Sequence, residues 1–161
     1  MDKYYKEEVL DLLKEKNIQF EVMDTPVMSI AQGKNYNLPH REAASKTLLL
    51  TDNKKEKLYC VCVFEDKSVD LKHLRQLIDS RRLSFASDEQ LLECFSFDSC
   101  ASPLGILNDE KREVEVIIDT YFKDKLIMIH PNDEKATLWL KTDDLISLIE
   151  EHGNKCLLIE L

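Results

Sequence analysis

The chain has 161 residues, 43% apolar and 33% charged, a size and composition that suit one globular domain spanning residues 1–161. No apolar run is long enough to cross a membrane, and no apolar signal core follows the charged N-terminus, so we expect a cytoplasmic protein without a membrane partner. The net charge of −9 argues against a protein that wraps duplex nucleic acid, and five cysteines without paired spacing argue against a disulfide framework or a zinc site.

Apolar spacing predicts the elements of the first half of the chain. Helices are expected from residue 2 to about residue 17 and after the caps Ser29, Asp70 and Ser87, and the residues after Ser29 and Ser87 match capping boxes. Strands are expected at residues 18–23, 46–51 and 58–64. The last of these is apolar on both faces, which indicates a central strand that is covered on both sides.

The second half opens with an irregular stretch at residues 96–107. Strands are then expected at residues 114–119, 126–129, 136–140 and 156–161. The helix between the last two begins at the cap Thr142 and stops at Gly153, and the short connection at residues 121–125 suggests an antiparallel pair. Strands and helices mix without strict alternation, so we expect a mixed α/β (α+β) fold, with helices around a curled, largely antiparallel mixed sheet.

Lys46 is the first candidate for chemistry, because it opens an apolar strand. Period-two alternation places it on the same face as Leu48 and Leu50, and small residues precede it at positions 43–45. A partly buried ammonium needs an anion or a polar ligand. Lys46 could therefore contact a phosphate or polarise an ester carbonyl, although a strand-end lysine could also extend its ammonium to water.

The segment Ser99-Cys100-Ala101-Ser102-Pro103-Leu104-Gly105 is the second candidate. Pro103 and Gly105 fit the second and fourth positions of a type I turn, and Gly105 would let a ligand approach the backbone closely. Backbone amides there could hold a substrate carbonyl or a ribose, but an ordinary tight turn explains the same spacing. Ser102 or Cys100 as a nucleophile would need a positioned base, and the sequence has none nearby.

His130 is the third candidate, because it follows the strand at residues 126–129 and precedes Pro131. An imidazole at a strand end can donate or accept a hydrogen bond near neutral pH, and it can equally be structural. The usual motifs of zinc proteases, serine hydrolases and nucleotide-binding loops are absent from the sequence. We therefore expect neither a metal nor a cofactor.

These segments together resemble the YbaK-like aminoacyl-tRNA deacylase family, which includes bacterial prolyl-tRNA editing proteins and the editing insert of prolyl-tRNA synthetase. The resemblance covers nearly the whole chain and lies in the order of its parts. These are Lys46 before its strand, the stretch 66–95, the SPLGILND segment at 102–109, and His130-Pro131 with the helix that follows.

The resemblance implies an editing-domain fold and hydrolysis of the ester that joins a mischarged amino acid to the terminal adenosine of a tRNA. Alanine on proline tRNA is the first expectation. Lys46 would be the catalytic residue, polarising the scissile ester and offsetting oxyanion charge. The implied substrate-binding residues are Ser102, Pro103, Leu104, Gly105 and His130.

The resemblance also implies the remaining parts of the reaction. Water would attack the ester with help from the ribose hydroxyl, without a metal, a cofactor or a covalent enzyme nucleophile. The expected partner is the 3′ acceptor end of an aminoacyl-tRNA, with proline tRNA as the first expectation. Prolyl-tRNA synthetase is a second candidate partner, and DNA is not expected.

The chain departs from the family pattern in ways that leave the fold expectation unchanged. The family's glycine and histidine before the lysine fall at Glu42–Ala44, the loop's opening glycine is Ser99 or Cys100, and the aromatic residue after Ser-Pro is Leu104. An Asn-Thr-Ala-Thr sequence is replaced by residues 134–137, which begin with a glutamate. Two alternatives therefore stay open: a catalytically silent relative that binds aminoacyl-tRNA or a synthetase, and a hydrolase that uses Cys100.

Overall fold

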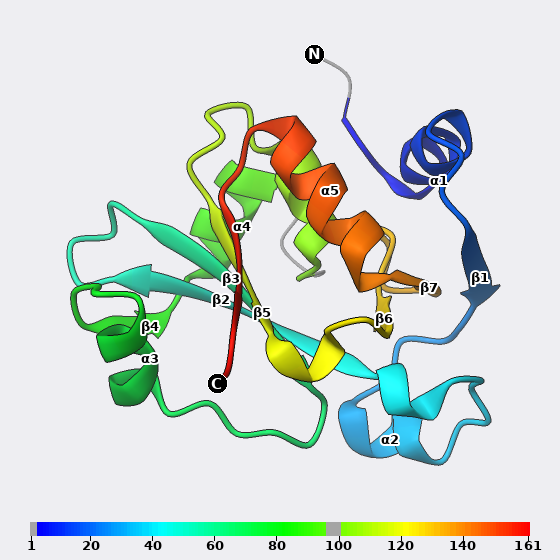
Figure 1. The fold of residues 1–161 in the computed structure, drawn as a ribbon, viewed down its shortest axis with the longest axis horizontal. Coiled ribbons are helices and arrows are strands. Elements are labelled where there is room, and N and C mark those ends of the chain that lie inside the picture. Colours follow the sequence, from blue (N-terminus) through cyan, green and yellow to red (C-terminus); the bar gives the residue numbers. More distant parts are fainter. Residues whose placement is uncertain (1–2, 96–100) are drawn as a thin grey trace.

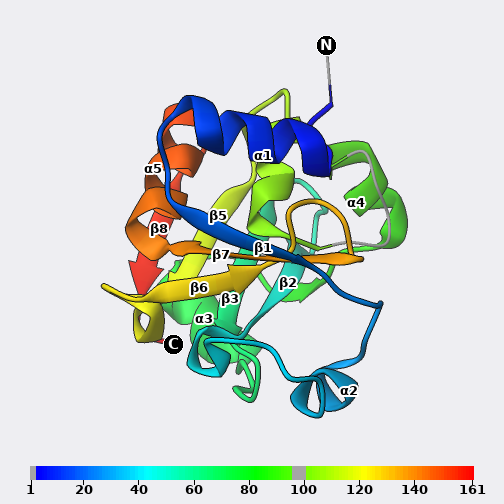
Figure 2. The same cartoon turned by 90° about the vertical axis from the view of Figure 1, so that its right-hand side faces the viewer.

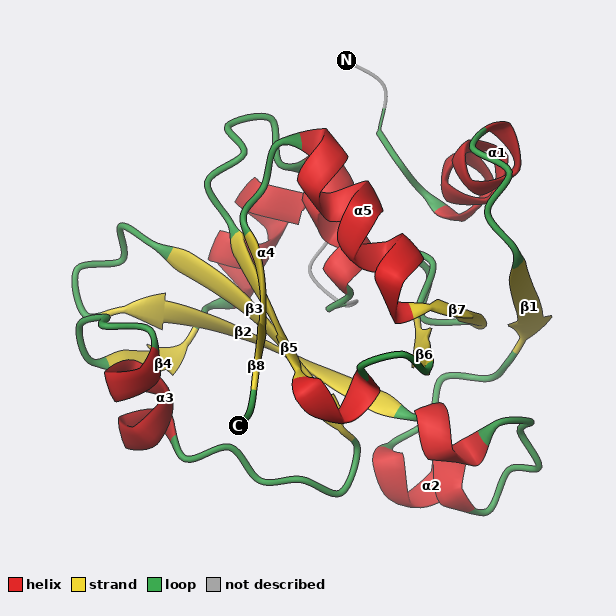
Figure 3. Cartoon of the chain, in the orientation of Figure 1, coloured by secondary structure: helices red, strands yellow, loops and turns green. Residues whose placement is uncertain are grey.

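The computed structural model describes residues 3–95 and 101–161 (Figures 1 and 3). Its strands are β1 (Phe20–Asp24), β2 (Ser45–Asp52), β3 (Leu58–Phe64), β4 (Leu83–Phe85), β5 (Glu115–Asp119), β6 (Leu126–Ile129), β7 (Ala136–Lys141) and β8 (Cys156–Ile159). Its α-helices are α1 (Lys6–Glu15), α2 (Ile30–Lys34), α3 (Leu71–Leu77), α4 (Asp88–Phe95) and α5 (Thr142–His152). Short 3-10 helices are η1 (Arg41–Ala43), η2 (Pro103–Asn108) and η3 (Thr120–Phe122). None of the described helices is long and apolar enough to span a membrane.

The strands form two sheets, one with the order β4-β2-β3-β5-β8 and one with the order β1-β7-β6. Figure 2 shows β1, β7 and β6 side by side, with α2 standing apart from them. Within the described residues, β3–β5 and β5–β8 are the parallel pairs and the other pairs are antiparallel. The predicted mixed α/β fold is confirmed.

Two sheets replace the single curled sheet that the sequence suggested, and they meet at an isolated bridge between Ala44 and Met128. The expected antiparallel turn at residues 121–125 is wrong. Both edges of β5 are taken by the parallel neighbours β3 and β8. The chain therefore leaves β5 through η3 and begins β6 in the other sheet.

The core has two apolar clusters on opposite faces of the five-stranded sheet. Alternate residues of β3 serve both: Cys60 and Cys62 belong to the larger cluster, and Val61 and Val63 to the smaller one. The larger cluster also takes buried residues from α1, α4, α5 and the three-stranded sheet, whereas the smaller one is covered by α3. The prediction that residues 58–64 form a doubly covered central strand is confirmed.

Most predicted helix ends are confirmed. Ser29 and Gln32 form the expected capping box at α2, the Asp70 carboxylate accepts from two amides at the start of α3, and Gly153 ends α5 in the left-handed region at φ 107°. Thr142 is not a cap: it is the first residue of α5, and its hydroxyl is buried without a hydrogen-bond partner among the described residues. The helix expected from residue 2 begins at Lys6, and residue 2 lies outside the described part.

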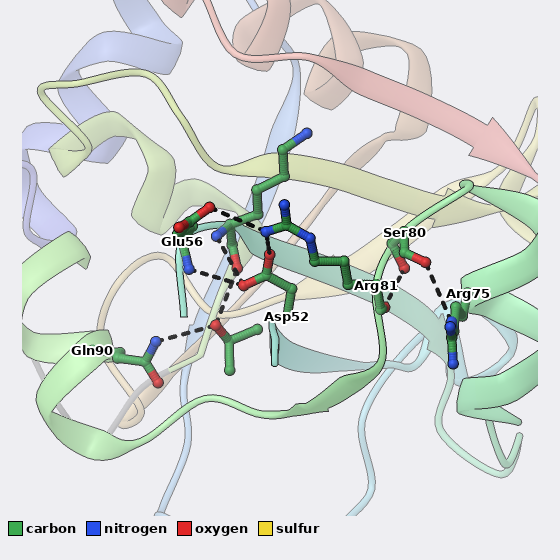
Figure 4. Close-up of polar contacts among 8 residues, drawn as sticks. Asp52, Glu56, Arg75, Ser80, Arg81 and Gln90 are labelled. Carbon is green, nitrogen blue, oxygen red and sulfur yellow. Dashed lines mark hydrogen bonds and ion pairs between the residues drawn. The ribbon is translucent and has the colours of Figure 1, made fainter. Parts of the chain in front are cut away.

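The edge strand β4 was not predicted, because three residues are too few for a periodic pattern. It pairs with β2 near a cluster of polar contacts at the turn that joins β2 to β3 (Figure 4). There the buried Asp52 carboxylate accepts from the Glu56 amide at 2.8 Å and pairs with Arg81 at 3.5 Å. Burial alone would raise the pKa of Asp52, but the amides of Glu56 and Lys57 and the charge of Arg81 outweigh burial and hold the pKa below its ordinary value.

Candidate functional site

A pocket of about 310 Å³ lies where the two sheets meet. Its walls come from the segment between β1 and α2, from η1, from the first residues of β2, and from the end of β6 and the β6–β7 connection. The elements are held together at this place by the Ala44–Met128 bridge and by the Ser45 hydroxyl, which donates to the Met128 carbonyl at 2.5 Å. The pocket is therefore part of the junction between the sheets.

Two of the residues singled out in the sequence, Lys46 and His130, both line this pocket. The bridge explains why they lie near one another. Ala44 and Met128 pair in parallel, so Lys46 and His130, each two residues further on, continue in the same direction beyond it. The half-buried Lys46 shares a strand face with Leu48, as its spacing predicted.

His130 is fixed on both its side chain and its backbone. Its Nδ1 lies 2.7 Å from the Ala136 carbonyl, and its own carbonyl accepts from the Ser102 hydroxyl at 2.6 Å. Because a carbonyl oxygen can only accept, Nδ1 carries a hydrogen. In the neutral ring, Nε2 is then the nitrogen with the free lone pair.

The segment Ser102-Pro103-Leu104-Gly105 forms the predicted turn, with the Gly105 amide donating to the Ser102 carbonyl at 2.9 Å. All four residues are buried, and none of them is among the described residues that line the pocket. The preceding residue, Ala101, does line it. Ser102 is fully buried, and its hydroxyl also accepts from the Leu104 amide at 3.2 Å. The segment thus supports the pocket wall through His130, and its part in substrate binding stays a prediction.

Gly105 has a packing role that the sequence did not indicate. A Cβ atom placed on it would lie 2.7 Å from Cδ2 of Phe95, closer than carbon atoms can approach without displacement. The glycine therefore accommodates a phenyl ring of the core, and its predicted approach to a ligand stays a prediction. Ser99 and Cys100 lie outside the described residues.

An ion pair at the pocket wall was missed by the sequence analysis. Nη2 of Arg41 lies 2.9 Å from Oε1 and 3.1 Å from Oε2 of Glu65, whose side chain is only 8% exposed. Glu65 directly follows the apolar strand β3, and a carboxylate in that place could have been suspected of needing a partner. The pair neutralises two of the charged side chains that line the pocket.

A buried hydroxyl pair closes another part of the wall. The Oγ1 atoms of Thr25 and Thr137 lie 2.9 Å apart, and both residues line the pocket. The Thr25 amide also donates to the Lys135 carbonyl at 2.9 Å. These contacts attach the segment after β1 to the start of β7, and no pattern in the sequence pointed to them.

The described cysteine thiols lie outside the pocket wall. Burial is the main cause that raises the pKa of both Cys94 and Cys156 to about 12, so these thiols stay protonated at neutral pH. None of the four described cysteines lines the pocket. Within residues 3–95 and 101–161, no group of three His, Cys, Asp or Glu side chains is placed to share a metal ion.

The model of the aminoacyl-tRNA editing domain matches residues 24–148. This range contains every wall of the pocket described above, from Thr25 to Thr137. The chain belongs to the aminoacyl-tRNA editing family. The family predicted from the order of Lys46, the SPLGILND segment and His130-Pro131 is confirmed.

Proteins with similar sequences cover most or all of the chain. The prolyl-tRNA editing protein ProX of Acetoanaerobium sticklandii is 35% identical over 164 residues, which cover 100% of both chains. The prolyl-tRNA synthetase associated domain-containing protein 1 of Bos taurus is 28% identical over 144 residues, or 85% of this chain and 84% of the relative. A structure solved as a candidate trans-editing enzyme for prolyl tRNA synthetase has a TM-score of 0.68 at 16% identity, covering 97% of this chain and 96% of the other. This last likeness supports the editing-type fold.

Proposed function

We propose that this editing-family protein is a trans-acting deacylase that hydrolyses the ester of a mischarged tRNA, with alanyl-tRNA for proline as its preferred substrate. The observation that carries the proposal is Lys46 on the wall of a small pocket, with no ion pair or hydrogen bond to any other described side chain. Family membership and full-length similarity to a prolyl-tRNA editing protein support the same activity. In this proposal residues 1–161 act as one editing domain.

The proposed reaction uses Lys46 as the catalytic residue. Its ammonium polarises the ester carbonyl and stabilises the negative charge that develops on the oxygen when water attacks. The terminal ribose hydroxyl assists the water, and neither a metal, a cofactor nor an enzyme nucleophile takes part. The Nε2 lone pair of His130 is available to accept a hydrogen bond from the substrate.

The size of the pocket is compatible with a small ligand such as the aminoacyl end of a tRNA. At about 310 Å³ it lies at the lower end of the roughly 300–1,000 Å³ typical of ligand pockets. A synthetase selecting proline rejects a smaller side chain poorly, because each missing methylene is worth only about 1–3 kcal/mol. A second, smaller pocket can exclude proline by size and remove alanine.

The proposed partner is the 3′ acceptor end of aminoacyl-tRNA in the cytoplasm. A net charge of −9 suits a protein that grips one end of the nucleic acid better than one that covers a duplex. The relatives named for an association with prolyl-tRNA synthetase make that enzyme the second candidate partner. A synthetase that holds the tRNA would compensate for weak electrostatic attraction.

The test is a deacylation assay with alanyl-tRNA for proline, followed by cysteinyl, seryl and threonyl esters. We expect wild type to release alanine fastest, and Lys46→Ala to lose about 100- to 1,000-fold in kcat/KM, as when one oxyanion-stabilising group is removed. The control is Lys72→Ala, on an exposed part of α3, which should keep wild-type activity. Equal rates for wild type and Lys46→Ala would refute this role of the lysine.

Two outcomes of the assay would favour other readings. Tight binding of alanyl-tRNA without turnover would support a catalytically silent regulator, a function compatible with the buried state of Ser102 to Gly105. Loss of hydrolysis after alkylation of Cys100, together with an inactive Cys100→Ser variant, would support a cysteine-dependent hydrolase. Activity that survives alkylation excludes the thiol.

A further inference from the structure

Glu134 lines the same pocket as Lys46 and His130. It lies in the β6–β7 connection, at a position where the resemblance to editing proteins led us to expect an asparagine. The side chain is half-buried, and among the described residues it has neither an ion pair within 4.0 Å nor a hydrogen bond. A carboxylate on a pocket wall without a partner in the protein is suited to a partner in the ligand.

The connection that carries Glu134 is held at several points. The His130 imidazole bonds to the Ala136 carbonyl at 2.7 Å, and the Ala136 amide donates to the Asp133 carbonyl at 3.1 Å. The Asp133 carboxylate also accepts from the Lys135 amide at 2.9 Å. These bonds lie on both sides of Glu134, so its backbone is fixed relative to the imidazole in the same wall.

Two of the charged side chains in the pocket wall have no partner of opposite charge among the described residues. Apart from His130, the described side chains that line it include two bases and two acids, and Arg41 is paired with Glu65 at 2.9 Å. Lys46 and Glu134 remain as one unpaired positive and one unpaired negative charge. A free ammonium and a free carboxylate in one wall complement a ligand that carries both a developing negative charge and a positive group.

An aminoacyl ester is such a ligand. Its ester carbonyl oxygen becomes negative during hydrolysis. Its α-amino group is protonated in water at pH values below its pKa of about 8. Resting on the proposed deacylase function, we propose that Glu134 binds the α-ammonium of the aminoacyl group while Lys46 faces the ester. Glu134 is then a specificity-determining residue, and the pocket selects esters with a free α-amino group.

The test uses two stable nucleosides that differ only in the amino group. One is 3′-deoxy-3′-(L-alanylamino)adenosine, in which an amide replaces the ester, and the other is its 3′-propionylamino counterpart. We expect wild type to bind the alanyl compound about 10- to 100-fold more tightly in calorimetry, the range for a hydrogen bond to a charged group. In Glu134→Gln the two affinities should become nearly equal, because the alanyl compound loses its charged partner.

Controls and opposing outcomes are defined by the same measurement. Glu160→Gln, an exposed acid outside the pocket, should keep the wild-type preference. The inference is overturned if Glu134→Gln keeps that preference, if both compounds weaken equally, as expected for a carboxylate on the ribose hydroxyls, or if wild type shows no preference. Binding is independent of hydrolysis, so a wild type that prefers the amine without cleaving alanyl-tRNA would refute the deacylase and leave this inference standing.

Discussion

Replacing Ser102 by alanine tests whether the buried turn positions the pocket wall. Ser102 has no exposed surface, and its hydroxyl both donates to the His130 carbonyl at 2.6 Å and accepts from the Leu104 amide at 3.2 Å. Removing it leaves one carbonyl and one amide without this partner, at a loss of about 1 kcal/mol or more each. We expect the free energy of unfolding to fall by about 2 kcal/mol and the melting temperature by about 4–8 °C.

Thermal and denaturant unfolding of Ser102→Ala would measure this loss, with the exposed Ser84→Ala as the matched control. Because the lost bond holds the backbone of His130, deacylation should also fall at temperatures where the variant is folded. Ser84→Ala should change neither quantity. A Ser102→Ala protein that melts within one degree of wild type would show that the hydroxyl does not support the wall.

Three further predictions concern the surrounding structure. Asp52→Asn should remove stability that wild type has at neutral pH and loses as the pH falls below about 4, because the fold stabilises the ionised carboxylate, whose pKa is lowered, and not the protonated one. Denaturant unfolding from pH 3 to 7 should show the free energies of unfolding of the two proteins converging in acid. Gly105→Ala should reduce the free energy of unfolding by about 1–3 kcal/mol in chemical denaturation, because its Cβ would meet the Phe95 ring. Glu65→Gln should lower it by about 2 kcal/mol in the same assay, less than for a fully buried pair, because the partner Arg41 is 31% exposed.

Patterns that depend on neighbouring residues predicted much of the fold. Capping boxes gave the starts of α2 and α4, and the unbroken apolar run at residues 58–64 gave the central strand β3. Strand pairing was less accessible, because it depends on which edges remain free. The parallel neighbours of β5 placed β6 in a second sheet, although the short connection at residues 121–125 suggested a hairpin.

The pocket shows the same division between local and distant effects. Lys46 and His130 could be singled out because each stands at the end of an apolar strand, where a polar side chain is unusual. Arg41 and Glu65 could not, since each looks ordinary until the fold brings them to 2.9 Å. For Gly105 the sequence left open a ligand or an ordinary turn, and the structure shows that it adjoins the ring of Phe95. A sequence does not tell which group approaches a glycine.

The charge of the pocket wall bears on how an acidic protein can act on a nucleic acid. The lysine and arginine side chains that line it are matched in number by its glutamates, so the wall has no excess positive charge to attract phosphates. Electrostatic attraction of a nucleic-acid backbone depends on such an excess. The pocket instead offers separate positive and negative groups, Lys46 and Glu134, which fit the dipolar aminoacyl end of a tRNA. Recognition of the phosphate backbone must then come from other surfaces or from a partner, and in our proposal the pocket distinguishes substrates by the amino acid they carry.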